Sequence, residues 1–349
     1  MSTDKTPEIS FLRNVGLMMT YRCQVACPHC VVAAGPHRKE EVALEEALDW
    51  AGQIAGYRNG RIKVLSLTGG EPFCCLDKLK KIIDFAARSG MFVTVVTNAF
   101  WAKSQDEAVQ VLRKLEGLKM LGISADAHHQ MAIPFDRVRN AILAAQECGL
   151  SLRILAAAED EAAPAHQAML ASLHELTSPE NLQPVATFLA GRALAEIDAS
   201  RYRTSGTPCQ SRCAAAGAPV LFPDGQVIAC IGALIALPIR HPLVLGNLRE
   251  NSLAEILDKA EVNSILHTLR IWGPSKLVSM IEQSELKCEL PSRYIENTIC
   301  DPCYKIMSNP RLAEWVAQLA TDHDHKRTVA YGRAYHLKEI EMLNSLGWR

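Results

Sequence analysis

Six short apolar runs, separated by stretches with helical periodicity, constrain the fold of this chain more than any other feature of its sequence. Each run is rich in apolar or β-branched residues, as expected for strands of a parallel sheet that is buried on both faces. The alternation therefore predicts an α/β fold. The expected strands are residues 15–20, 63–68, 92–97, 120–124, 151–156 and 184–189.

The stretches between these runs carry apolar residues at the spacing of one helix face. Leu44, Ala47, Leu48 and Ala51 recur at this spacing, and Gly90 is placed to end the helix that follows residue 76. Strand–helix–strand units of this kind are right-handed and build an open or partly closed barrel. Six strands are two fewer than the closed eight-stranded barrel needs, so we expect a partial (β/α)6 barrel.

The character of the sequence changes near residue 205. Residues 205–208 have the composition of a linker, and Pro-Asp-Gly within residues 222–226 predicts a turn between two short strands. Helical periodicity returns after Cys303, with Leu312, Trp315, Val316 and Leu319 spaced for one buried face. We therefore expect a barrel over residues 1–205, a small C-terminal extension over 206–310 and a helical tail over 311–349.

The charge balance argues against a highly charged partner. Lys and Arg total 37 and Asp and Glu total 38, so the formal net charge of −1 provides no field that attracts nucleic acid or an anionic membrane. The longest apolar stretch, residues 227–237, is shorter than a membrane span. Asp4, Lys5 and Glu8 interrupt the N-terminus, which argues against a secretory signal. We expect a soluble, cytoplasmic protein with no nucleic-acid and no membrane partner.

Nine of the twelve cysteines gather in two regions of the chain. A cytoplasmic protein keeps its thiols reduced, so clustered cysteines indicate metal binding rather than disulfides. Cys23, Cys27 and Cys30 directly follow the first expected strand. The C-terminal half holds Cys209, Cys213, Cys230, Cys288, Cys300 and Cys303.

The first cysteine group has the spacing C-x3-C-x2-C. Three thiolates at this spacing suit three corners of a 4Fe–4S cubane and leave the fourth iron without a protein ligand. A zinc site with His29 or His37 as its fourth ligand is the alternative. The loop after a barrel strand is an active-site position, however, which favours a catalytic cluster over structural zinc.

A second motif ends the second expected strand, where the chain reads Thr68-Gly69-Gly70-Glu71-Pro72. The two glycines let a ligand approach the main chain, and Glu71 offers a carboxylate to a cationic group. Together, the cysteine loop and this Gly-Gly-Glu-Pro segment resemble the radical S-adenosylmethionine (SAM) superfamily. The resemblance covers roughly residues 15–200.

The resemblance implies a cofactor and a set of ligands. Cys23, Cys27 and Cys30 would ligate the 4Fe–4S cluster, SAM would chelate its open iron, and Gly69, Gly70, Glu71 and Pro72 would hold the methionyl amine. A one-electron donor of the flavodoxin or ferredoxin type would reduce the cluster, and SAM would be cleaved to a 5′-deoxyadenosyl radical. The remaining SAM contacts would be Asn98, Ser124, Asp126 and Arg192, for which ordinary strand-end hydrogen bonding is the alternative.

The second cysteine group also resembles a known element. Cys213, eleven residues, Gly225, four residues and Cys230 resemble the start of the SPASM and twitch extensions of radical SAM enzymes, and Cys300-Asp301-Pro302-Cys303 supplies a later pair. The resemblance implies that Cys213, Cys230, Cys300 and Cys303 ligate one auxiliary 4Fe–4S cluster; structural zinc is the alternative. Cys209, four residues before Cys213, is an alternative ligand, and Cys209 and Cys288 together are candidates for a second auxiliary cluster; the expected role of both is that of small packing residues.

Other candidate residues have weaker signals. Cys74, Cys75 and Cys148 are expected to pack. His128 and His129 follow the fourth strand, and either is a candidate base for the substrate's proton after hydrogen abstraction, with a structural role as the alternative. His323 and His325 are expected in a solvated loop between tail helices rather than in a metal site.

These observations predict a radical SAM enzyme that oxidises a ribosomally made peptide. A dehydrogenase or related enzyme for a small sugar-like natural-product intermediate is the alternative within the family. Only about fourteen residues precede the first strand, so we expect any leader-peptide-binding protein to be a separate chain. A non-catalytic iron–sulfur or zinc module is the rival from another class.

Overall fold

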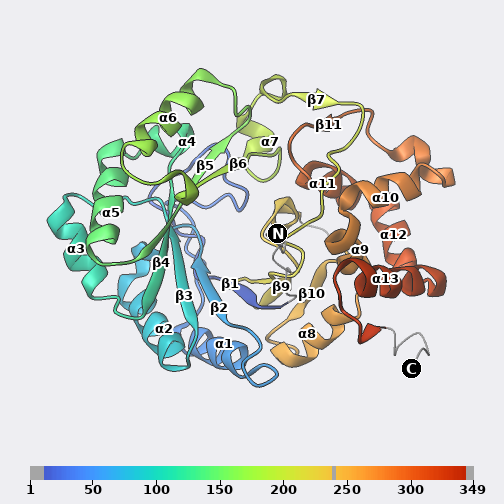
Figure 1. The fold of residues 1–349 in the computed structure, drawn as a ribbon, viewed down its shortest axis with the longest axis horizontal. Helices are drawn as coiled ribbons and strands as arrows, with labels where there is room; N and C mark the ends of the chain where they lie inside the picture. Colours follow the sequence, from blue (N-terminus) through green and yellow to red (C-terminus); the bar gives the residue numbers. More distant parts are fainter. Residues whose placement is uncertain (1–11, 238–240, 343–349) are drawn as a thin grey trace, which may run out of the picture.

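A computed structural model describes residues 12–237 and 241–342 (Figure 1). Six parallel strands lie side by side in chain order, and each is hydrogen-bonded to the next. Asp4, Lys5 and Glu8, on which the expectation about a signal sequence rests, lie outside the described residues. The six strands are β1 (Asn14–Met18), β2 (Val64–Thr68), β3 (Phe92–Thr97), β4 (Leu118–Ser124), β5 (Ser151–Ala158) and β6 (Leu182–Ala186).

All six expected strands are present, and the last is displaced. Strand β6 begins at Leu182, which pairs with Ile154, and its ladder ends where Ala186 pairs with Ala158. The apolar residues after Ala186 therefore belong to the turn that leads away from the sheet. The expectation of an α/β partial barrel with six parallel strands is confirmed.

Helices cover the outer side of this sheet (Figure 1). They are amphipathic: α2, for example, buries Leu79, Ile82, Ile83 and Ala86. Gly90 follows that helix with a φ of +78°, in the left-handed region that glycine adopts without strain. The helices of the barrel are α1 (Leu44–Gly56), α2 (Leu76–Arg88), α3 (Gln105–Arg113), α4 (Ala127–Gln130), α5 (Phe135–Glu147), α6 (Pro164–His174) and α7 (Ala193–Glu196).

The C-terminal extension continues the same sheet. Its strand β8 (Val220–Leu221) pairs with β1 in parallel, and β9 (Gln226–Ile228) and β10 (Val244–Asn247) follow as antiparallel neighbours. The expected turn joins β8 to β9, where Gly225 has a φ of +86°. Barrel and extension therefore share one sheet.

The rest of the extension is helical and lies on the opposite side of the molecule from α3 and α5 (Figure 1). A short antiparallel pair of strands, β7 (Thr204–Ser205) and β11 (Tyr294–Ile295), joins its first and later parts. None of the helices in the described ranges is long and apolar enough to cross a membrane. The helices are α8 (Leu253–Glu261), α9 (Ser264–Trp272), α10 (Pro274–Ile281), α11 (Cys300–Ser308), α12 (Pro310–Leu319) and α13 (His323–His336).

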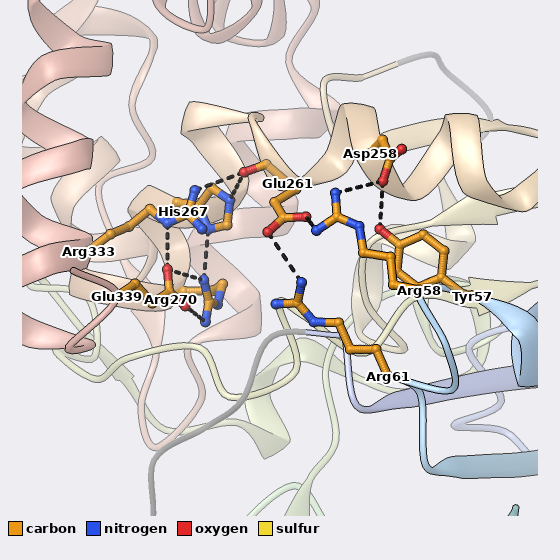
Figure 2. A network of polar contacts seen from close by, with 9 residues as sticks. All are labelled: Tyr57, Arg58, Arg61, Asp258, Glu261, His267, Arg270, Arg333 and Glu339. Carbon is orange, nitrogen blue, oxygen red and sulfur yellow. Dashed lines mark hydrogen bonds and ion pairs between the residues drawn. The ribbon is translucent and has the colours of Figure 1, made fainter. Parts of the chain in front are cut away.

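A network of charged groups joins the barrel to the extension (Figure 2). Glu261, at the end of α8, pairs with Arg61 at 3.4 Å and with Arg58, both of which follow α1. Its main-chain oxygen accepts hydrogen bonds from His267 Nε2 at 2.7 Å and from Arg333 Nη1 at 2.8 Å. One residue thus contacts the barrel, α9 and α13, which fixes the orientation of the extension against α1.

Glu339 balances two buried arginines in the same network (Figure 2). It pairs with Arg270 at 2.8 Å and with Arg333 at 2.5 Å, and these arginine side chains are 3% and 7% exposed. Burial opposes ionisation of Glu339, but the hydrogen bonds and charges of Arg270 and Arg333 outweigh it and lower the pKa of this carboxyl. The segment after α13 is therefore held by charge as well as by packing.

We expect Glu339→Gln to lower the free energy of unfolding by about 2 kcal/mol at pH 7. Removing one partner of a buried pair costs roughly 3–5 kcal/mol, and the partial exposure of Glu339 reduces this. Because the carboxylate stabilises only when ionised, the difference should shrink below about pH 4. Urea unfolding of the variant and the wild type measures this difference in the free energy of unfolding. Glu341→Gln, at an exposed glutamate, is the control, and equal stability of the two variants would contradict this role.

The expectation for the tail histidines is partly wrong. Asp322 accepts a hydrogen bond from the main-chain nitrogen of His325 and caps α13, so these residues begin a helix rather than form a loop. His325 is buried, and its Nε2 lies 3.1 Å from Thr268 Oγ1 in α9. His323 remains exposed.

Candidate active site

Three cysteines surround a cavity at the carboxyl ends of the barrel strands. Cys23 and Cys27 are buried and Cys30 is half-buried, and all three line this cavity of about 240 Å³. Burial raises the pKa of Cys23 to about 12, so a bound cation is needed to keep its thiolate form. Three soft sulfur ligands around one space suit an iron–sulfur cluster.

The glycines after β2 line the same cavity and pack closely against the cysteine loop. Gly69 and Gly70 lie so near the loop that a Cβ at Gly69 would be 2.6 Å from Thr20 O, and one at Gly70 would collide with Arg22 O. Gly70 N also donates to Thr20 O at 2.6 Å. The glycines therefore allow contact between two segments of main chain in addition to leaving space for a ligand.

Glu71, expected from the resemblance to contact the methionyl amine, turns its side chain toward the protein interior. Its carboxylate is fully buried and accepts hydrogen bonds from Asn98 N at 2.8 Å, Thr97 Oγ1 at 2.8 Å and Phe73 N at 3.0 Å. Burial raises its pKa to about 7. Neither Glu71 nor its buried neighbour Pro72 is among the described residues that line the cavity. Glu71 instead ties the end of β2 to the end of β3.

Asn98 and Ser124 lie where the sequence places them, at the ends of β3 and β4 and on the cavity wall. Asn98 Oδ1 accepts a hydrogen bond from Gln24 Nε2 at 2.9 Å, and Asn98 Nδ2 lies 3.6 Å from Cys23 Sγ. The amide thus contacts the cysteine loop directly. Its position next to Cys23 is suitable for a ligand held beside the cluster.

Asp126 is a helix cap rather than a residue of the cavity wall. It is 1% exposed, and its Oδ1 accepts hydrogen bonds from the main-chain nitrogens of His128 and His129 at the start of α4. Its Oδ2 accepts from His129 Nδ1 at 2.8 Å. Burial opposes its charge, but the bond and charge of His129 lower the pKa of Asp126 to about 2.

Three histidines gather around this aspartate. The ring of His29 stacks on His128 at 4.6 Å between centroids and meets His129 edge-on at 4.9 Å. His29, Asp126 and His129 have potential metal-ligand atoms within 4.8 Å of one another. The His129–Asp126 hydrogen bond and the two capping bonds already use both oxygens of Asp126, so a hydrogen-bonded network explains the group.

The two candidate bases differ in their partners. His129 is held by Asp126 and by Cys27, and these contacts outweigh burial and raise its pKa to about 10. His128 Nε2 lies 2.6 Å from Glu159 Oε1, and both side chains are 7% exposed. Glu159 also pairs with Arg201 at 2.8 Å. Sequence reasoning missed Glu159, which directly follows β5; its only signal is an acidic residue at a strand end.

Arg192 contacts the cysteine loop rather than the open cavity. Its Nη1 donates to Cys27 O at 2.8 Å, its Nη2 donates to Ala34 O, and its main-chain nitrogen donates to Cys30 O at 3.1 Å. The expected contact with a SAM carboxylate would have to replace these bonds, and Arg192 is not among the described residues that line the cavity.

A second cavity lies in the extension, and four cysteines line it: Cys213, Cys230, Cys300 and Cys303. Gly232 lines it too, and a Cβ there would lie 3.3 Å from Cys300 Sγ and 3.6 Å from Cys230 Sγ. Burial raises the pKa of Cys213 to about 11 and that of Cys230 to about 12, so the thiols are neutral until a cation binds. Four converging sulfurs fit a fully ligated cluster.

The other cysteines are not among the described residues that line either cavity. Cys209 and Cys288 are not among the residues that line the second cavity, and Cys288 is exposed. Cys74 and Cys75 end a short 3-10 turn (Pro72–Cys75), where Cys75 Sγ lies 3.2 Å from Glu41 Oε2. Cys148 caps the end of α5.

Comparisons with known proteins cover both regions. A family model described as the radical SAM superfamily matches residues 17–156, and one described as the SPASM iron–sulfur cluster-binding domain matches residues 209–304. The first contains Cys23, Cys27 and Cys30. The second contains all four cysteines of the extension cavity.

Two curated proteins of Bacillus subtilis (strain 168) are similar to part of the chain. "Putative peptide biosynthesis protein YydG" is 24% identical over 130 residues, 37% of this chain and 40% of that protein. "Antilisterial bacteriocin subtilosin biosynthesis protein AlbA" is 24% identical over 127 residues, 36% of this chain and 27% of that protein. The matches thus span less than half of each relative.

Among solved structures, "Native anSMEcpe with bound AdoMet" has a similar fold. Its TM-score is 0.52 at 12% identity, covering 88% of this chain and 99% of that chain. At such low identity the likeness concerns the fold alone, in which a partial barrel is followed by a C-terminal extension.

Proposed function

We propose that this chain, which belongs to the radical SAM superfamily and carries a SPASM iron–sulfur domain, removes a hydrogen atom from a peptide substrate and oxidises it. The observation that carries the proposal is the pair of thiol-lined cavities. One has three cysteines at the mouth of the barrel, and the other has four in the extension. A three-thiol site leaves an iron free for SAM, whereas a four-thiol site leaves none.

In this proposal, Cys23, Cys27 and Cys30 hold the first 4Fe–4S cluster, and Gly69, Gly70, Asn98 and Ser124 form the wall against which SAM binds. When bound and reduced, the cluster and SAM supply a 5′-deoxyadenosyl radical. The chain itself positions the cysteine loop, because Gly69 and Gly70 let the end of β2 pack directly on its main chain beside the cavity. Glu71 and Asp126 support this wall from behind, through Asn98 and α4.

His128 is our candidate for the base that takes the substrate's proton. Its Nε2 lies 2.6 Å from Glu159 Oε1, and a proton held there leaves Nδ1 as the acceptor; among the described residues, His129 lines the cavity and His128 lies behind it, stacked on the cavity residue His29. Glu159 fixes the ring and stabilises the imidazolium that forms. His129 is less suitable because Asp126 and Cys27 already engage it.

We expect His128→Ala to lower peptide oxidation about 100-fold while 5′-deoxyadenosine release continues, because general-base catalysis contributes roughly 10²–10⁴ in rate. Glu159→Gln should cause a smaller loss, because it removes the charge that orients His128 but keeps the imidazole. Mass spectrometry of the peptide and chromatography of 5′-deoxyadenosine measure the two rates. His174→Ala, at an exposed position of α6, is the control. Equal peptide oxidation by His128→Ala and by the control would refute the assignment.

Cys213, Cys230, Cys300 and Cys303 hold one auxiliary 4Fe–4S cluster in this proposal. Fully ligated by protein, such a cluster supplies electron transfer rather than a binding site for substrate. The oxidation of a substrate radical releases an electron, so an acceptor in the same molecule favours net dehydrogenation or cross-linking.

The peptide substrate is inferred from the names of the relatives. The similar stretches of YydG and AlbA belong to proteins named for peptide and bacteriocin biosynthesis. The balanced charge of this chain also provides no reason to prefer a strongly anionic substrate.

Release of 5′-deoxyadenosine by the reduced protein tests the catalytic proposal against its non-catalytic rival. Anaerobically reconstituted protein, reduced with dithionite and mixed with SAM, should release 5′-deoxyadenosine. An electron-transfer or zinc module would release no 5′-deoxyadenosine, and that result would refute the catalytic proposal.

A further inference from the structure

We propose that Arg192 is a positioning residue that clamps the cysteine loop from the start of α7 and places a fixed positive charge beside the first cluster. The inference rests on the assignment of Cys23, Cys27 and Cys30 as its ligands. It differs from a role of Arg192 in binding SAM, which the resemblance to the family suggests.

The contacts of Arg192 converge on one loop. Nη1 donates to Cys27 O at 2.8 Å, Nη2 donates to Ala34 O, and the main-chain nitrogen donates to Cys30 O at 3.1 Å. Two of the three acceptors are therefore carbonyls of ligand cysteines. A guanidinium carries several donors in a fixed plane, so it can hold two carbonyls at once, which a lysine cannot do in the same geometry.

Gly191 brings this arginine to the loop. Its φ of +60° lies in the left-handed region, and a Cβ at this position would collide with Val31 O and lie 2.8 Å from Cys30 O. The turn between β6 and α7 can approach the cysteine loop this closely only with glycine there. Gly191 and Arg192 thus form one contact that spans about 160 residues of sequence.

The charged side chain of Arg192 is largely shielded from solvent. Its side chain is 14% exposed, and its carboxylate partner, Glu196, is 3.8 Å away and about half exposed. The charge is thus only weakly neutralised by the protein. Reduction adds negative charge to an iron–sulfur cluster, so a nearby cation favours the reduced state and raises the midpoint potential.

Three variants separate the effect of the hydrogen bonds of Arg192 from the effect of its charge. Arg192→Gln removes both, Arg192→Lys keeps the charge but loses the paired donors, and Arg203→Gln removes an exposed arginine that pairs with Asp160 at 2.9 Å. Each full-length protein is reconstituted anaerobically. Iron loss to a chelator is then timed, and the midpoint of the first cluster is measured by electron paramagnetic resonance, with its signal identified by the change on adding SAM.

We expect Arg192→Gln to lose iron about ten times faster than wild type, since partners that support metal ligands typically change affinity 10–100-fold. Its midpoint should become more negative. Arg192→Lys should lose iron faster yet keep nearly the wild-type midpoint, and Arg203→Gln should match wild type in both.

A different pattern would overturn the inference. If Arg192→Gln and Arg192→Lys keep the wild-type iron-loss rate and midpoint but bind SAM more weakly, Arg192 is a SAM ligand and not a clamp. If Arg192→Gln does not fold, the Lys variant still decides, because a wild-type iron-loss rate in it contradicts the clamp. Neither the iron-loss rate nor the midpoint potential requires turnover. The inference about Arg192 can therefore fail while the proposed function stands, and the proposed function can fail while the inference stands.

Discussion

Replacement of Cys27 by Ala is expected to abolish 5′-deoxyadenosine release, to about 1% of wild type or less. Cys27 is 8% exposed and shares a cavity with Cys23 and Cys30, so its loss leaves two thiolates for a cluster that needs three. The protein should remain soluble because the residue lies in a loop and not in a helix or strand. Chromatography of the reaction measures 5′-deoxyadenosine release, and iron analysis of the protein measures the loss of the cluster.

Cys148→Ala is the matched control for this prediction. Cys148 is half-buried at the end of α5 and lines neither thiol cavity, so its variant should cleave SAM at the wild-type rate. Undiminished SAM cleavage by the Cys27→Ala protein would contradict the ligand assignment.

Joint replacement of Cys300 and Cys303 by Ala is expected to halve the iron content, from about eight to about four atoms per chain, since each cubane carries about four. The two thiols are half of the set that lines the extension cavity. SAM cleavage should continue, whereas oxidised peptide should fall below detection because the electron acceptor is lost. Iron analysis, 5′-deoxyadenosine release and peptide mass are measured on the same preparation.

Joint replacement of Cys209 and Cys288 by Ala is the control for the auxiliary site. Neither residue lines the extension cavity, so this variant should retain about eight irons and full turnover. About twelve irons in the wild type would indicate a third cluster, and zinc in place of iron would indicate a structural site. Either result, or full turnover by the Cys300/Cys303 variant, would contradict the proposal of one auxiliary cluster.

Local sequence patterns predicted the barrel because its strands are near-continuous apolar runs that pair in chain order. Phe92–Thr97 has the expected bounds, and the ends of its neighbours differ by a few residues. The addition of β8 to the sheet was not predictable in this way. Val220–Leu221 is too short to show a period, and its partner Gly16 lies about 200 residues earlier.

The cysteines were found by spacing because iron coordination restricts how far apart neighbouring ligands lie along a loop. Contacts between segments that are distant in the sequence have no characteristic residue spacing. The pairing of His128 with Glu159 spans 31 residues, and the bond from Arg192 to Cys27 spans 165. The orientation of Glu71 was not predictable either, because the hydrogen-bond donors that hold its carboxylate lie at the end of β3, outside its own motif.

Transfer of deuterium from substrate to cofactor tests the central claim most directly. A deuterated precursor peptide, chosen from short peptides encoded beside this chain's gene, is mixed with reduced protein and SAM. The account predicts deuterium in 5′-deoxyadenosine and a peptide that has lost hydrogen. Unlabelled 5′-deoxyadenosine with an unchanged peptide mass, found for every such peptide, would contradict the claim that this chain oxidises a peptide by hydrogen-atom abstraction.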